Sequence, residues 1–153
     1  MCKLKILFVS IFVMMLLVAG VFACSLNKDI KSDGNNMKLL IDNVEVEVEW
    51  ENNESVKQIS KIASSSDIIV NTHRYGGFEQ VGEIGQNIVS NNVQMTTEPG
   101  DIVLYSGNSI VIFFGSNSWS YTKLGKIKNK NLNELKQLLD KSNATIMIKN
   151  SNS

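Results

Sequence analysis

Four residues able to take part in chemistry stand close together in the segment HRYGGFEQVG, residues 73–82. They are the chain's only histidine, His73, its only arginine, Arg74, and then Phe78 and Gln80. A single histidine cannot supply the several imidazoles of a histidine-rich zinc site, so we expect no metal centre. A Ser-His-Asp arrangement is formally available, but the chain has no G-x-S-x-G turn that would present a nucleophilic serine.

The glycines in and after this segment are Gly76, Gly77, Gly82 and Gly85, and they match neither a P-loop nor a G-x-G-x-x-G motif. We therefore expect no nucleotide and no other cofactor. Glycine reaches positive φ and lets a strand bend without a Cβ clash, which is how a sheet turns corners. We favour bends in a sheet, with the His-Arg pair at the surface near a strand end. A binding groove beside the bends is the alternative.

The first 24 residues predict export. Lys3 and Lys5 precede an apolar run from Ile6 to Phe22, which is the order of a secretory signal. The run ends in Val-Phe-Ala-Cys, which resembles the lipobox of bacterial lipoproteins, so Cys24 is the predicted lipidation site. The protein would then lie at the outer face of a cell membrane, held by a lipid anchor. Ordinary cleavage with secretion and an uncleaved membrane anchor are the alternatives.

The remaining chain predicts one domain without disulfides, because no cysteine follows Cys24. Residues 25–36 are polar and indicate a tether, residues 37–149 form the domain, and residues 150–153 are a polar tail. Without the signal the chain keeps all fifteen acidic residues but loses two of the fifteen basic ones, Lys3 and Lys5. A slightly acidic domain argues against a nucleic-acid partner, for which a basic face is required.

Alternating and helical patterns predict the elements of this domain. The segment VEVEVEW alternates strictly and indicates one half-buried strand, which Asp42 and Asn43 join to the strand before it. Ser-Gly-Asn at 106–108 marks a hairpin. We expect Asn53 to cap a helix, and Asn131 to open a second helix through a capping box. The predicted strands cover 37–41, 44–50, 67–73, 101–105, 109–115, 118–127 and 144–149, and the predicted helices cover 54–64 and 131–140.

These elements predict a mostly antiparallel closed β-barrel of about eight strands with two short helices over its open ends. Phe113 and its neighbour Phe114 alternate in direction, so one belongs to the core and the other to a helix contact or a groove. Trp119 and Tyr121 share one face of their strand. We favour core packing under a helix for this aromatic pair, with a ligand platform as the alternative.

The segments YGGFEQVGEIG, PGDIVLYSGNSIVIFFG and SYTKLGKI, in this order, resemble the bacterial cyclophilin-like family of small β-barrels, some of them on exported lipoproteins. The resemblance covers about residues 37 to 149. It implies a closed barrel of eight strands, two helices and a surface groove. It implies no established activity.

Cyclophilins proper accelerate prolyl cis/trans isomerisation, whose barrier is about 18–20 kcal/mol, by donating from an arginine to the prolyl nitrogen. The resemblance implies Arg74, Phe78 and Gln80 as catalytic candidates, although their spacing is shorter than in the enzymes and no QGGD-like continuation follows. Two functions stay open: a non-enzymatic module that binds a peptide or small ligand, and a peptidyl-prolyl isomerase acting on exported proteins. The candidates for the groove are His73, Phe113, Trp119 and Tyr121.

Overall fold

The computed structural model describes residues 36–152. The described residues belong to one compact unit. The predicted signal segment, the predicted lipidation site Cys24 and nearly all of the predicted tether lie outside the described residues. Within the described part of the chain, no helix is long and apolar enough to cross a membrane.

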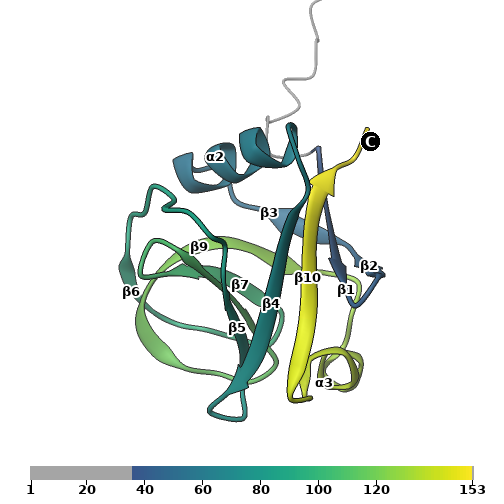
Figure 1. The fold of residues 1–153 in the computed structure, drawn as a ribbon. Coiled ribbons are helices and arrows are strands. Elements are labelled where there is room, and N and C mark those ends of the chain that lie inside the picture. Colours follow the sequence, from purple (N-terminus) through teal and green to yellow (C-terminus); the bar gives the residue numbers. More distant parts are fainter. Residues whose placement is uncertain (1–35, 153) are drawn as a thin grey trace, which may run out of the picture. The chain divides into compact units, whose positions relative to one another are not determined.

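Ten strands and two helices make up the described domain, and Figure 1 shows their arrangement. The helices are α2 (Glu54–Ala63) and α3 (Leu132–Leu139). The strands are β1 (Met37–Ile41), β2 (Val44–Val46), β3 (Val48–Trp50), β4 (Ile68–Tyr75), β5 (Glu79–Glu83), β6 (Val93–Thr96), β7 (Asp101–Tyr105), β8 (Ser109–Phe113), β9 (Ser118–Ile127) and β10 (Asn143–Asn150).

Nine of the strands form a nearly closed antiparallel barrel in the order β2-β1-β10-β4-β5-β8-β7-β9-β3. The two strands at the ends of this order, β2 and β3, are consecutive in the chain and are separated only by Glu47. Because β2 pairs with β1 and β3 pairs with β9, this one segment joins the two edges of the sheet. The predicted barrel is confirmed. Its nine strands exceed the seven predicted ranges for two reasons. The segment predicted as one strand divides at Glu47, whose N–H donates to Asn129 Oδ1 at 3.0 Å, and β5 forms where no strand range was predicted.

Strand β6 was missing from the sequence prediction. It pairs with the first half of β9, from Ser118 to Tyr121, whereas the second half of β9 pairs with β7. The side chains of β6 are exposed or only half-buried, so its sequence VQMT carries no alternation that would mark a strand. Pairing with β9 therefore defines this strand. The two-stranded ribbon that results stands at one side of the barrel (Figure 1).

The side chains of the barrel form two apolar clusters, one on each side of the sheet. The larger one fills the barrel and includes Ile102, Leu104, Ile110, Ile112 and Leu124, all fully buried. The smaller one lies on the opposite side of the same strands, since strand side chains alternate between faces. Its members are Val103, Val111, Phe113 and Tyr121, with Phe78, Val81 and Met95 packed against them. This second cluster forms the base of the site described below.

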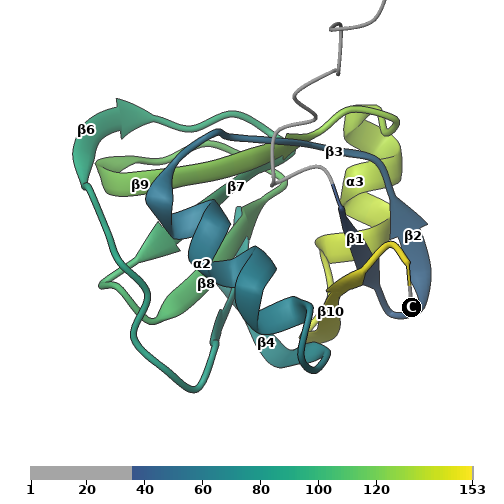
Figure 2. The ribbon, with the colours of Figure 1, turned by 90° about the horizontal axis from the view of Figure 1, so that it is seen from above.

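Both helices begin as the sequence predicts. Asn53 caps α2 by accepting from the N–H of Val56 at 3.0 Å. The capping box of Asn131 and Glu134 at the start of α3 is complete. The helices lie at opposite ends of the barrel in Figure 1, and Figure 2 shows α2 from above, across its end. The expectation of helices over the open ends is confirmed.

The glycine-rich segment is a turn, as the favoured interpretation has it. Gly76 and Gly77 join β4 to β5 with φ angles of 59° and 75°, which glycine adopts without strain. Gly82 serves the fold differently, because a Cβ there would lie 2.6 Å from Val70 Cγ1 and 2.7 Å from the carbonyl oxygen of Asn71. The absence of a side chain at this position lets β5 approach β4.

Candidate functional site

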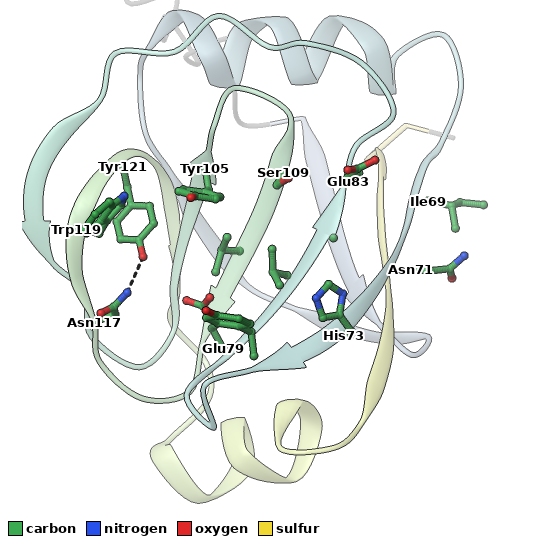
Figure 3. Close-up of a pocket in the computed structure, with 14 residues that line it drawn as sticks. Ile69, Asn71, His73, Glu79, Glu83, Tyr105, Ser109, Asn117, Trp119 and Tyr121 are labelled. Atoms are coloured by element: carbon green, nitrogen blue, oxygen red, sulfur yellow. Dashed lines mark hydrogen bonds between the residues drawn. The ribbon is translucent and has the colours of Figure 1, made fainter.

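A pocket of about 840 Å³ opens on the outer face of the barrel, over β4, β5, β7, β8 and β9. The pocket is open to solvent, and Figure 3 draws the residues that line it as sticks. The residues that line it are Ile69, Asn71, His73, Tyr75, Glu79, Val81, Gly82, Glu83, Tyr105, Ser109, Val111, Asn117, Trp119 and Tyr121.

Strand alternation explains which side chains reach this pocket. In β4 the residues at even positions from Ile68 to Thr72 are buried in the barrel, so the odd positions face outward. The opposite wall comes from β9, which carries Trp119 and Tyr121 on its β6-paired half. Figure 3 shows these two aromatic residues with Asn117 on one side of the pocket and Ile69 and Asn71 on the other.

Glu79 is the most unusual polar group of the pocket. It is only 7% exposed, and its Oε2 atom is buried without a hydrogen-bond partner. Burial raises the pKa of this carboxyl group from its ordinary value of 4.5 to about 7. No neighbouring cation offsets the burial. In Figure 3 the carboxyl group points toward the side formed by Asn117 and Tyr121.

Tyr121 lies between the pocket and the outer apolar cluster. Its ring packs edge-on against Phe113 and Tyr105, with ring centres 5.7 Å and 6.1 Å away. Its hydroxyl oxygen accepts a hydrogen bond from Asn117 Nδ2 at 2.9 Å. Burial raises the pKa of Tyr121, and the negative charge of Glu79 raises it further by a smaller amount. The hydroxyl and the Glu79 carboxyl group are therefore close enough to interact electrostatically.

The charges around the pocket are negative. Two carboxylates, Glu79 and Glu83, line it, and His73 is the one basic side chain. Among the described residues no lysine or arginine belongs to its lining. Nor does the described part of the chain gather three histidine, cysteine or carboxylate side chains in a group that could hold a metal ion.

The structure brings together three of the four groove candidates. His73, Trp119 and Tyr121 line the pocket, whereas Phe113 is fully buried beneath Tyr121. The favoured interpretation of Trp119 as core is wrong, since this side chain is 56% exposed. Phe114 belongs to the barrel interior, as the alternation of the two phenylalanines predicts.

The three catalytic candidates do not meet in this pocket. Arg74 and Gln80 are register partners of β4 and β5, but they point to the barrel side of the sheet. Arg74 reaches past the end of the barrel and pairs with Asp140, with 3.0 Å between Nε and Oδ1. Phe78 belongs to the turn before β5 and stacks on Phe113 at 6.5 Å between ring centres. Phe78 and Gln80 thus point to opposite sides of the sheet, not to one face.

Gln80 has a structural environment. It is fully buried, and its Nε2 donates to the carbonyl oxygens of Leu139 at 2.8 Å and Lys141 at 2.6 Å. Its Oε1 accepts from Thr72 Oγ1 at 2.9 Å. The side chain therefore ties β5 to the C-terminal end of α3, where helix carbonyls lack intrahelical partners. With these bonds made, it cannot reach a peptide on the outer face.

Sequence reasoning missed Glu79, Tyr105 and Asn117. A signal for Glu79 was present, because it lies two residues before Val81 on the same face of a strand, next to the singled-out Phe78 and Gln80. Its burial could not be read there, since the covering side chains come from other strands. Asn117 lies in the loop between two strands, where neither strand alternation nor helical periodicity predicts the direction of its side chain.

A nearly closed antiparallel barrel with helices at its ends and an open pocket on its outer face defines the class of protein. The chain belongs to the cyclophilin-like family, whose family model matches residues 39–149. Among solved structures it is similar to a hypothetical protein from Archaeoglobus fulgidus, determined in solution, with 19% identity and a TM-score of 0.51. That match covers 75% of this chain and 93% of the archaeal one, and at this identity it shows the fold alone. No curated protein matches the sequence.

Proposed function

We propose that this cyclophilin-like domain is a non-enzymatic binding module that holds a small ligand or a peptide side chain in its outer pocket. The observation that carries the proposal is the pocket itself, about 840 Å³ in volume, with aromatic walls and one buried carboxyl group. Ligand sites are typically concave, mostly apolar and supplied with a few placed polar groups. Three aromatic side chains remain well exposed at this pocket: Tyr75 at 62%, Trp119 at 56% and Tyr105 at 40%.

The groups around the pocket favour binding over conversion. Ser109 donates to Oδ1 of Asn108 at 3.2 Å, so its hydroxyl is oriented by an amide rather than activated by the His73 imidazole. A nucleophile needs a base within hydrogen-bond reach, and among the described residues no such pair lines the pocket. The polar groups can therefore orient a bound molecule more readily than they can transform it.

Chemical-shift mapping of small aromatic probes by NMR tests this proposal, with benzyl alcohol as the first probe. We expect probe-dependent shifts at pocket residues such as Val111 and Trp119, and their loss in Val81→Trp, whose indole would occupy the pocket. The thermal midpoint of the variant serves as the check that it is folded. Shifts spread over the surface, or unchanged binding in folded Val81→Trp, would contradict the proposal.

Prolyl isomerisation is the alternative function. The placement of Arg74 at Asp140 and of Gln80 inside the barrel does not favour it. A protease-coupled proline-peptide assay decides between the functions. We expect a rate equal to the uncatalysed one. Acceleration that falls at least tenfold in Arg74→Ala would establish the isomerase instead.

We also propose export with a lipid anchor at Cys24. The support is the sequence of the first 24 residues, with its basic start, apolar run and terminal Ala-Cys pair. Labelling of bacterial cells with radioactive palmitate tests it, because lipidated protein carries the label into the membrane fraction. We expect Cys24→Ser to lose the label. Unlabelled wild-type protein in the culture medium would indicate ordinary secretion.

A further inference from the structure

We infer that the outer pocket selects a ligand that carries an ammonium group on an apolar body, with Glu79 as the partner of the ammonium group. This inference rests on the proposed binding function and names the ligand class of that site. Three properties of the described residues support it: an unsatisfied buried carboxyl group, an aromatic enclosure, and the absence of competing cations from the lining.

Glu79 lacks the partner that a buried carboxyl group normally has. Its side chain is only 7% exposed, and its Oε2 atom is buried without a hydrogen-bond donor. Buried acids in proteins are generally paired or hydrogen bonded, and an unsatisfied one is costly. Asp101, the other described acid with an unbonded buried oxygen, has Lys123 and Lys126 within 3.8 Å. Glu79 has no such lysine, and a ligand ammonium group can take that place.

The walls of the pocket suit the apolar part and the charge of such a ligand. Tyr105, Trp119 and Tyr121 lie along one side, and two of these aromatic side chains are at least 40% exposed. Aromatic faces attract cations through the ring quadrupole and also cover apolar surface. A carboxyl group at the base of an aromatic wall therefore binds an ammonium group from two directions.

The electrostatics disfavour the opposite choice. An anionic ligand would meet Glu79 and Glu83 without a lysine or arginine in the described lining to neutralise it. His73, across the pocket on β4, is the only basic side chain among the described residues of the lining. A neutral ligand would leave the carboxyl group unpaired whenever it is ionised. A cationic ligand satisfies the pocket's charges and its unpaired oxygen together.

Two sources can supply this chemistry: a free organic amine and a lysine side chain of a peptide. The pocket is open to solvent, so a peptide could lie across it while one side chain enters. We therefore use two matched pairs of probes. Benzylamine is compared with benzyl alcohol, and the capped peptide Gly-Lys-Gly is compared with its norleucine counterpart, which lacks only the ammonium group.

Protonation of the site makes the inference testable by pH. The pKa of Glu79 is raised to about 7, so about 3% of this group is ionised at pH 5.5 and about 90% at pH 8. The other titratable groups of the described lining are His73 and Tyr75 on β4, Tyr105 on β7 and Tyr121 on β9, with Glu83 on the same strand as Glu79. Both probe amines stay protonated throughout.

The experiment measures the dissociation constants of the four probes by NMR titration at pH 5.5 and pH 8. At pH 8 we expect an ammonium probe to bind at least about tenfold more tightly than its neutral counterpart. Its affinity should fall by up to roughly 30-fold at pH 5.5, while that of the neutral probe stays within about twofold. The amine pair and the peptide pair report the two sources separately.

Glu79→Gln and Glu47→Gln provide the matched variants. Both remove one negative charge with little change of shape, but the exposed Glu47 lies between β2 and β3, away from the pocket lining. We expect only the Glu79 substitution to abolish the preference for ammonium and its pH dependence, with neutral probes still bound. Equal affinity of charged and neutral probes would overturn this inference and leave the binding function standing. Absence of all binding at the pocket would overturn both.

Discussion

The clearest physical consequence of the pocket is that Glu79→Gln should stabilise the protein more at alkaline pH than at acidic pH. The pKa of Glu79 is about 7 in the folded state, against an ordinary value of 4.5 when solvent surrounds the group. The folded protein therefore binds this proton more tightly than the unfolded chain does. Stability from this group is fully present below pH 4.5, falls as the pH rises from 4.5 to 7, and levels off above 7.

The size of the effect follows from the difference between the two pKa values. A pKa rise from 4.5 to about 7 corresponds to roughly 3 kcal/mol across the full range, at about 1.4 kcal/mol per unit. Between pH 5 and pH 8 the expected loss is smaller, about 2 kcal/mol, because part of the titration lies outside this interval. A glutamine cannot ionise, so the variant lacks this part of the pH dependence.

Urea unfolding of both proteins at pH 5 and pH 8 measures this difference, with the fluorescence of the half-buried Trp50 as one probe. At each pH we take the difference in unfolding free energy between the variant and the wild type, and we then compare the two differences. The cost of burying the glutamine amide is the same at both pH values, so it cancels. We expect the difference to move by about 2 kcal/mol in favour of Glu79→Gln at pH 8. A difference that does not change with pH would show that the carboxyl group titrates normally in the fold. The reasoning from burial would then be refuted.

Three further substitutions test the assignments of the fold. Gln80→Ala removes three buried hydrogen bonds and should cost about 3 kcal/mol of unfolding free energy in urea titrations; a cost below about 1 kcal/mol would contradict its role. Gly82→Ala should lower the unfolding free energy by at least about 2 kcal/mol, because the added Cβ overpacks the contact between β5 and β4. The control Gly85→Ala should lower it by about 1 kcal/mol, since this position has open space but a φ of 88°. Equal shifts of the thermal midpoint in the two variants would refute the distinction. Arg74→Ala breaks a half-exposed ion pair with Asp140 and should cost at most about 0.5 kcal/mol, and a larger loss by calorimetry would indicate a buried role.

Much of the fold could be predicted because its signals are local. The turn at Asp42 and Asn43 has positive φ at both residues, as its sequence suggests, and the capping residues Asn53 and Asn131 act on amides within the next three positions. Such contacts depend on neighbours along the chain. The strand β6 escaped prediction because its exposed and half-buried side chains show no alternation, and only its pairing with β9 defines it.

The candidate site was predicted only in part, for a related reason. His73, Trp119 and Tyr121 were singled out by residue type, and they line the pocket. Phe78 and Gln80 are two residues apart, and this spacing places two side chains on one face only within a continuous strand. In the structure Phe78 lies in the turn before β5, so the strand period does not apply to it, and the two side chains separate.

By itself the sequence determined which segments pair locally, where helices start, and that the domain is a small acidic barrel without disulfides, because these properties follow from periodicity, caps and composition. Only the tertiary structure decided that Glu79 is buried without a partner while Gln80, the next residue, holds the end of α3. The two side chains leave the strand in opposite directions, and what each meets depends on β4, β9 and α3, which are distant in sequence. Burial, and with it the pKa of the carboxyl group, is a property of that assembled surrounding.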